Sequence, residues 1–110
     1  MTDFKDREKA FEAKFAHDAE MLFRVTARRN RLLGEWAAEK MGLTPEEAEA
    51  YAKEVIAADF EEVGDEDVIR KVLGDMTSAN CDIDDAGVRA ALEAKSVEAH
   101  RQFIDSVGKD

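Results

Sequence analysis

Four positions in the last third of the chain match part of a calcium-binding loop. The residues at positions 1, 3, 6 and 12 of that loop would be Asp82, Asp84, Gly87 and Glu93. In such a loop carboxylates bind the ion and the glycine makes the sharp turn. However, Ala86 occupies position 5, where an oxygen donor is expected, and Arg89 brings a long cation into the loop. Asp84 and Asp85 are explained more simply as the start of a helix, so we predict no metal ligand here.

The two histidines and the single cysteine do not form a catalytic or redox pattern. A di-iron helical bundle requires Glu three residues before His, but Lys14 precedes His17 and Val97 precedes His100 at that spacing. Cys81 has no second cysteine with which to form a redox pair, and the chain has no glycine-rich loop that would bind phosphate. We therefore predict no catalytic residue and a protein that is not an enzyme.

A short basic cluster is formed by Arg28, Arg29 and Arg31, and it has two interpretations. The arginines either pair with the acidic run over residues 43–63, which holds seven acidic residues and one basic residue, or form a secondary surface for a partner or ligand. Weak nucleotide binding is the natural form of the second interpretation. No other cofactor is predicted.

The overall charge argues against one class of partner. Sixteen basic and twenty-six acidic residues give a net charge of −10, whereas nucleic-acid binding draws most of its affinity from neutralising phosphates. This charge also disfavours anionic membrane surfaces, and no apolar run is long enough to span a bilayer. A lone cysteine fits a reducing compartment. We expect no nucleic-acid partner, no direct membrane insertion and a cytoplasmic protein that is monomeric when free.

Glycine, proline and capping residues divide the 110 residues into four helical runs. The runs are residues 3–41, a second that starts after Thr44 and ends at Gly64, a third that is capped by Asp65 and frays over residues 77–80, and a last one from Asp84 or Asp85 to Gly108. No segment alternates with the two-residue period of a half-buried strand. The sequence therefore predicts an all-α protein, a four-helix bundle.

The second run has a complete helix start. Gly42 suits the position after the first helix, Thr44 is an N-cap, Pro45 stands at the first helical position and Glu47 completes a capping box. The predicted apolar face of this run consists of Ala48, Ala52, Val55, Ile56, Phe60 and Val63.

The first run is unusually long, because residues 3–41 contain no strong breaker except Gly34, whereas ordinary helices span 8–20 residues. Its C-terminal part is predicted to pack through Met21, Leu22, Val25, Leu32, Leu33 and Trp36. The first eighteen residues carry few aliphatic side chains and many charges, so they are expected to fray in isolation. We therefore divide the chain into a flexible amphipathic segment, residues 1–18, that is disordered or a frayed helix when free, and a four-helix bundle over residues 19–110.

Three of the six phenylalanines lie in the first fifteen residues, at Phe4, Phe11 and Phe15. On a helix of 3.6 residues per turn, spacings of seven and four place them on one face. Such a stripe either packs on the protein's own core or docks in the groove of a partner.

Several stretches within about the first 70 residues match a known family. They are Arg7-Glu8 with Glu12-Ala13-Lys14-Phe15-Ala16-His17-Asp18, Ala27-Arg28-Arg29-Asn30-Arg31-Leu32-Leu33-Gly34 with Trp36-Ala37-Ala38-Glu39, Tyr51-Ala52-Lys53-Glu54-Val55 with Ala58-Asp59-Phe60-Glu61, and Gly64-Asp65-Glu66-Asp67-Val68 with Arg70-Lys71. In these stretches the chain resembles the ζ-subunit family, the inhibitors of the F-type ATP synthase in alphaproteobacteria. About the last 30 residues resemble the family only in their helical pattern.

The resemblance implies a four-helix bundle whose N-terminal segment enters the catalytic head of the synthase. There, at an interface of α and β subunits near the rotor γ subunit, the segment would block rotation in the hydrolytic direction. Carried onto this sequence, the inhibitory region is residues 1 to about 18, with Phe4, Arg7, Glu8, Phe11, Glu12, Lys14, Phe15 and Asp18 as partner-binding residues. The protein would then lie at the cytoplasmic face of the membrane-bound synthase. The alternatives are a small acidic helical regulatory or scaffold module with an unrelated partner, and a bundle that binds nucleotide or calcium weakly.

Overall fold

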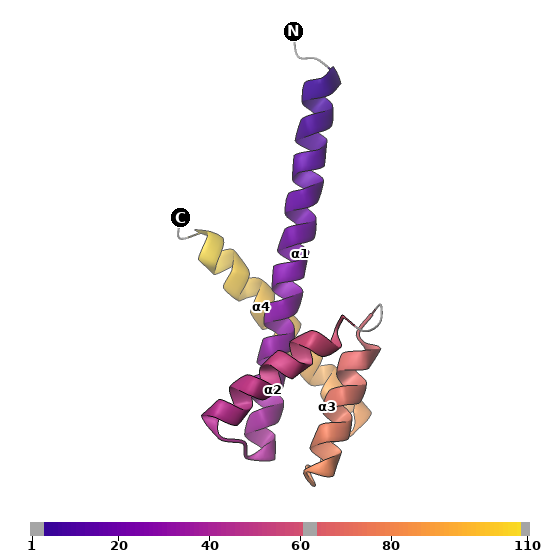
Figure 1. Ribbon diagram of the computed structural model, residues 1–110, viewed down its shortest axis with the longest axis vertical. Coiled ribbons are helices and arrows are strands. Elements are labelled where there is room, and N and C mark those ends of the chain that lie inside the picture. Colours follow the sequence, from indigo (N-terminus) through magenta and orange to yellow (C-terminus); the bar gives the residue numbers. More distant parts are fainter. Residues whose placement is uncertain (1–3, 61–63, 109–110) are drawn as a thin grey trace.

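The computed structural model consists of four α-helices, which confirms the predicted all-α four-helix bundle (Figure 1). The helices are α1 (Phe4–Met41), α2 (Pro45–Ala58), α3 (Glu66–Ser78) and α4 (Asp85–Gly108). The structure describes the backbone of residues 4–60 and 64–108 and the side chains of residues 19–60 and 64–106, and this part contains no strand. The molecule measures 66 × 31 × 22 Å, because α1 extends well beyond the other helices (Figure 1).

Gly34 lets α1 continue through its closest crossing with α2. A Cβ atom at this position would lie 2.7 Å from the Cα of Ala52 and 3.3 Å from Cγ2 of Val55. The missing side chain therefore allows the two helix backbones to approach, and Gly34 does not break the 38-residue helix.

The predicted start of α2 is confirmed. The Thr44 hydroxyl accepts a hydrogen bond from the Glu47 amide at 3.2 Å, and Glu47 accepts one from the Thr44 amide at 2.9 Å. These bonds satisfy two of the backbone donors that a helix N-terminus leaves free. Gly42, with φ of 74°, ends α1 in the left-handed region where glycine is favoured.

The end of α2 differs from the prediction. The helix stops at Ala58 rather than near Gly64, and Phe60 is 66% exposed instead of contributing to the apolar face. Asp65 does precede α3 as predicted, but its side chain makes no capping bond. Its carboxylate instead accepts a hydrogen bond from Arg29 of α1. A contact across 36 residues of sequence thus replaces the local cap.

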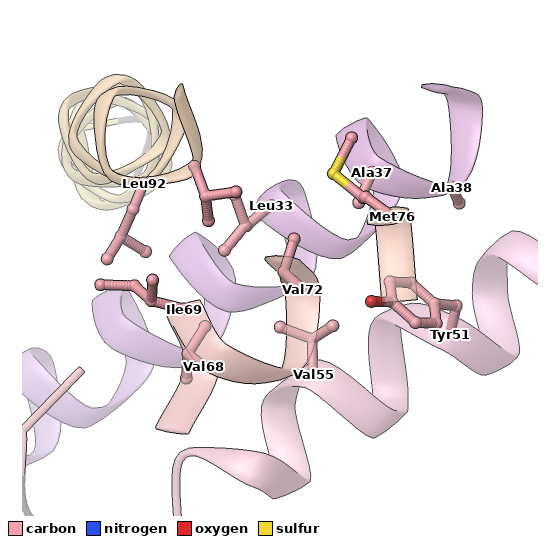
Figure 2. Close-up of a cluster of buried hydrophobic side chains, with 11 residues drawn as sticks. Leu33, Ala37, Ala38, Tyr51, Val55, Val68, Ile69, Val72, Met76 and Leu92 are labelled. Atoms are coloured by element: carbon pink, nitrogen blue, oxygen red, sulfur yellow. The ribbon is translucent and has the colours of Figure 1, made fainter. Parts of the chain in front are cut away.

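The hydrophobic core lies where α2, α3 and the first half of α4 surround the last turns of α1, and we call this part the closed end. Figure 2 shows side chains from all four helices meeting here. The fully buried members are Leu33, Ala37, Ala38, Val55, Val68, Val72 and Val88, with Met76, Ile69, Tyr51 and Leu92 nearly so. The Tyr51 hydroxyl donates to Asp75 at 2.8 Å and thereby ties α2 to α3.

The other end of the bundle is less tightly closed. The last turns of α4 leave α1 at an angle (Figure 1), and we call the part formed by residues 19–32 and 95–106 the open end. The expectation that Leu22 packs in the core is wrong, because this side chain is 66% exposed. Leu33, eleven residues further along α1, is completely buried.

Candidate functional site

The N-terminal half of α1 stands away from the other three helices (Figure 1). The backbone of residues 4–18 continues α1 as a helix. The predicted partner-binding side chains of this segment lie outside the described side chains: Phe4, Arg7, Glu8, Phe11, Glu12, Lys14, Phe15 and Asp18. Their role, and the fraying of residues 1–18 in the free protein, stay predictions. On a helical backbone, however, positions 4, 11 and 15 share one face.

The three arginines of the basic cluster occupy different environments. Arg29 is nearly buried, and its guanidinium donates to Oδ1 of Asn30 at 2.9 and 3.0 Å and to Oδ1 of Asp65 at 3.0 Å. Asp59 lies 3.9 Å from the same guanidinium. Arg29 therefore ties α1 to both sides of the connection between α2 and α3. Removing it would leave Asn30, itself 1% exposed, without this partner.

Arg28 and Arg31 instead line a groove of about 780 Å³ at the open end, between α1, α2 and α4. Arg31 pairs with Glu35 of its own helix at 3.2 Å. Arg28 makes no hydrogen bond or ion pair with any side chain in the described part of the chain. Charge complementarity with the acidic run over residues 43–63 thus holds for Arg29 at Asp59, whereas the other two arginines line the groove.

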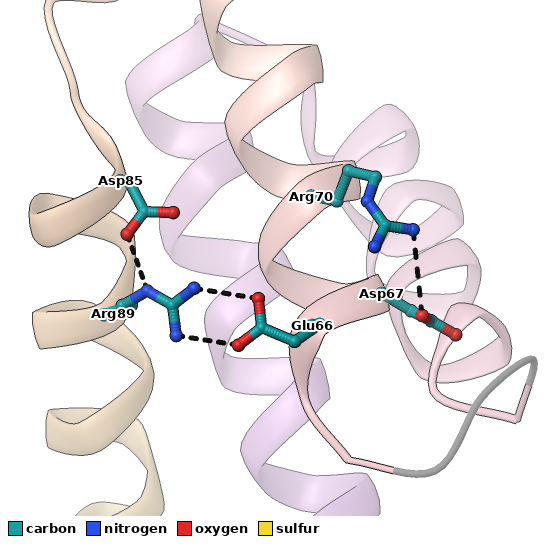
Figure 3. Close-up of polar contacts among 5 residues, drawn as sticks. All are labelled: Glu66, Asp67, Arg70, Asp85 and Arg89. Atoms are coloured by element: carbon teal, nitrogen blue, oxygen red, sulfur yellow. Dashed lines mark hydrogen bonds and ion pairs between the residues drawn. The ribbon is translucent and has the colours of Figure 1, made fainter.

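Two residues within the calcium-loop range, Asp85 and Arg89, take part in ion pairs (Figure 3). Arg89 forms a two-bond pair with Glu66 of α3, at 2.8 and 2.9 Å, and a third bond with Asp85 at 2.6 Å. The hydrogen bonds from Arg89 lower the pKa of Glu66. Asp84 accepts the Gly87 amide at 2.8 Å, as a helix cap does. Among the described residues no three His, Cys, Asp or Glu side chains gather as metal ligands would.

Cys81 and His100 lie in different parts of the bundle, and Cys81 is partly buried. The Cys81 thiol donates to the Lys40 carbonyl at 3.4 Å, beside Trp36 at the closed end. His100 is exposed on α4, and His17 lies outside the described side chains. Within the described residues, no helix combines the length and apolar character needed to cross a membrane.

A comparison with known families supports one interpretation of this chain. The family model of ATPase inhibitor subunit zeta matches residues 1–102. The chain belongs to this family. The match covers the projecting part of α1 and all but the last turns of α4, so it extends well past the first 70 residues. Membership of the zeta family supports an inhibitory role at an ATP synthase and is consistent with a regulator rather than an enzyme.

A solved structure supports the fold of this zeta-family chain independently. A protein whose structure was determined in solution by NMR is 49% identical to it and superposes with a TM-score of 0.70. The alignment covers 78% of this chain and 98% of that protein. A comparison with curated proteins gave no match.

Sequence reasoning missed two features of the surface. The groove depends on the angle at which α4 leaves α1, and no local pattern encodes that angle. The burial of Arg29 depends on Asp59 and Asp65, which are distant in sequence. The only signal for the second feature is the closeness of a basic run to an acidic one, which the charge pattern did indicate.

Proposed function

We propose that this zeta-family protein inhibits the F-type ATP synthase by docking the N-terminal part of α1 into the catalytic head. The docked helix would lie at an interface of α and β subunits against the rotor γ subunit and block rotation in the direction of ATP hydrolysis. The protein would thus act at the cytoplasmic face of the membrane-bound synthase. It would use no cofactor of its own.

The observation that carries the proposal is the continuity of α1. One helix runs from Phe4, outside the bundle, to Met41 in the closed end. A helical segment without tertiary contacts is marginally stable in water, and its apolar stripe gains most of its stability when a groove covers it. The phenylalanine stripe is therefore presented on an arm that is anchored at its base by the core.

The charged residues of the segment have a secondary role in this proposal. Arg7, Glu8, Glu12, Lys14 and Asp18 would surround the aromatic stripe and set orientation and encounter rate, as charges at an interface rim do. Arg28 and Arg31 belong to a separate surface, the groove at the open end. Arg29 is occupied inside the bundle, and we assign it the positioning of α1 against α2 and α3.

Hydrolysis of ATP by the isolated cognate synthase head tests the proposal. Phe11→Ala/Phe15→Ala removes two anchors, each of which contributes about 1.5–3 kcal/mol when buried. The combined loss of about 3–6 kcal/mol would weaken inhibition on the order of a hundredfold or more, although neighbouring anchors need not add fully.

The matched control is Lys5→Ala/Lys9→Ala in the same segment, which should change affinity far less. Circular dichroism checks folding in both variants. If the lysine variant loses more inhibition than the phenylalanine variant, the segment binds through charge and the anchor assignment is wrong. If the unmodified protein does not inhibit hydrolysis at all, the proposed function is wrong.

A further inference from the structure

We propose that the groove between α1 and α4 at the open end is a second docking surface, which binds an acidic amphipathic helix of the synthase head. The proposal rests on the inhibitor function and deepens it, because it gives the bundle its own contact with the enzyme. Three observations carry it: the position of the exposed apolar residues, the charge of the groove and the size of the groove.

Two large exposed apolar side chains meet beside the groove. They are Phe23 and Phe60, which are 57% and 66% exposed. Phe23 lines the groove and packs against Phe60 in a tilted pair, with 5.9 Å between the ring centroids and 34° between the ring planes. An aromatic pair left in solvent is unfavourable unless something covers it, and contiguous exposed apolar patches mark interaction sites.

The charge of the groove is opposite to that of the protein. Arg24, Arg28 and Arg31 follow one another at helical spacings of four and three along its α1 wall, with Glu35 as the single acidic residue of the lining. Among the described side chains, Arg24 and Arg31 pair only with exposed glutamates of their own helix, at 2.7 and 3.2 Å. Such exposed ion pairs contribute little to the stability of the protein, so each arginine can release its glutamate and bind a carboxylate of the partner instead. On a chain with a net charge of −10, this local positive potential selects an acidic partner.

The dimensions of the groove favour a helix as the occupant. Its α1 wall extends from Phe23 to Glu35, which at 1.5 Å per residue is about 18 Å, or about three helical turns. The apolar residues of its lining, which form what we call the floor, are Phe23, Ala27, Leu32, Ile56 and Phe103. An amphipathic helix of about twelve residues, with acidic side chains flanking its apolar face, would complement both the floor and the arginines.

Binding of the full-length protein to the purified synthase head, measured at low and high salt, tests the surface. Arg28→Glu/Arg31→Glu places like charges against the acidic helix, which should weaken binding by about tenfold or more. Lys40→Glu/Lys53→Glu makes the same change in net charge at exposed positions of the closed end and should leave the affinity within about twofold. The loss in the arginine variant should shrink at high salt.

An apolar pair of variants tests the floor without changing charge. Phe23→Ala removes a ring that lines the groove, whereas Leu22→Ala removes a neighbouring exposed side chain that does not line it. We expect about tenfold weaker binding for Phe23→Ala and little change for Leu22→Ala. Both side chains are mostly in solvent, so both variants should fold.

A photo-crosslinking residue at position 28 identifies the occupant. A crosslink to an acidic helical segment of the head supports the proposal. Crosslinks only to a second copy of the protein, or only to its own residues 1–18, would overturn it. Suppose that the unmodified protein inhibits, but the Arg28→Glu/Arg31→Glu and Phe23→Ala variants bind with unchanged affinity. This result would overturn the proposal that the groove is a docking surface and leave the proposed function intact. Absence of inhibition by the unmodified protein would instead remove the function on which the proposal rests.

Discussion

The closed end and the open end of the bundle are built on the same helix but use different side chains. At the closed end α1 presents Gly34, Ala37 and Ala38, and these small residues let neighbouring helices come close around Leu33. At the open end the same helix presents Phe23 and several arginines, and α4 diverges from it. Small residues therefore mark where this bundle is stabilised, and large or charged ones mark where it has surface available for binding.

The largest difference in stability is expected between two leucine-to-alanine variants, one at each end of the bundle. Leu33→Ala creates a cavity in a fully packed site and should lower the free energy of unfolding by about 2–5 kcal/mol. Leu22→Ala, at an exposed site on the same helix, should change it by less than about 0.5 kcal/mol. Urea unfolding measures both variants. Equal losses would show that the open end is as well packed as the closed end, contrary to the comparison.

Substitutions at two glycines should change the stability of the protein in opposite directions. Gly34→Ala would place a methyl group 2.7 Å from the Ala52 Cα, so the helices must separate, at a loss of about 1–3 kcal/mol. Gly74→Ala in α3 meets nothing within 4 Å and should stabilise the protein by about 0.5–1 kcal/mol. Thermal unfolding of the two variants should shift in opposite directions. A stabilising Gly34→Ala would mean that α1 and α2 do not cross as closely as described.

The capping box makes the stability of the folded protein depend on pH in the acidic range. Hydrogen bonds from the Thr44 amide and hydroxyl lower the pKa of Glu47 from its ordinary value of 4.5. A lowered folded-state pKa contributes stability that is present above the ordinary value and is lost as the pH falls through the lowered pKa. Thr44→Ala should cost about 1 kcal/mol at neutral pH.

The same variant should also lose less stability than the natural protein when the pH is lowered below about 4.5. Unfolding curves at pH 7 and pH 3 measure this, with Thr44→Ser as the control because it keeps the hydroxyl. Because Thr44→Ala keeps the backbone amide that donates to Glu47, an unchanged acid dependence in this variant would show that the Thr44 hydroxyl does not contribute to the lowered pKa.

The smallest effect on stability should come from removing residues 1–18. Because the core begins further along α1, the deletion should change the free energy of unfolding by less than about 0.5 kcal/mol. The helicity of each remaining residue should stay nearly constant, while inhibition of ATP hydrolysis is abolished. A truncated protein that unfolds would show that the phenylalanine stripe belongs to the protein's own core.

Local signals in the sequence were enough to predict most of the fold. The capping box at Thr44, the glycine at position 42 and the aspartates before α4 all act through neighbouring residues, so their effects can be predicted from spacing alone. The end of α2 could not be predicted from the sequence. The helical spacing of apolar residues continues to Phe60, although the helix itself ends at Ala58. That residue is instead held against Phe23 of another helix.

The candidate site was predictable to a different degree in its two parts. The aromatic stripe follows from the spacing of three residues. The family match supports an inhibitory role for the chain, and the part of the stripe in that role stays a prediction. The groove combines residues from three helices, and their meeting depends on crossing angles that single-helix patterns do not contain. Pairing of the arginines with the acidic run over residues 43–63 was one of the two predicted interpretations, and it holds for Arg29 at Asp59, whereas Asp65 lies outside that run.

The unbroken length of α1 also fixes an angular phase between the two ends of the molecule. Positions 15 and 33 are eighteen residues apart, which is about five full turns of an ideal helix, so they point in the same direction around its axis. In the proposed complex, inserting one residue near position 19 would turn the aromatic stripe by about 100° relative to the bundle while moving it only about 1.5 Å. Inserting eleven residues would nearly restore the phase but lengthen the arm by about 16 Å. Insertions in α1 can therefore change the direction in which the aromatic stripe faces and the length of the arm separately.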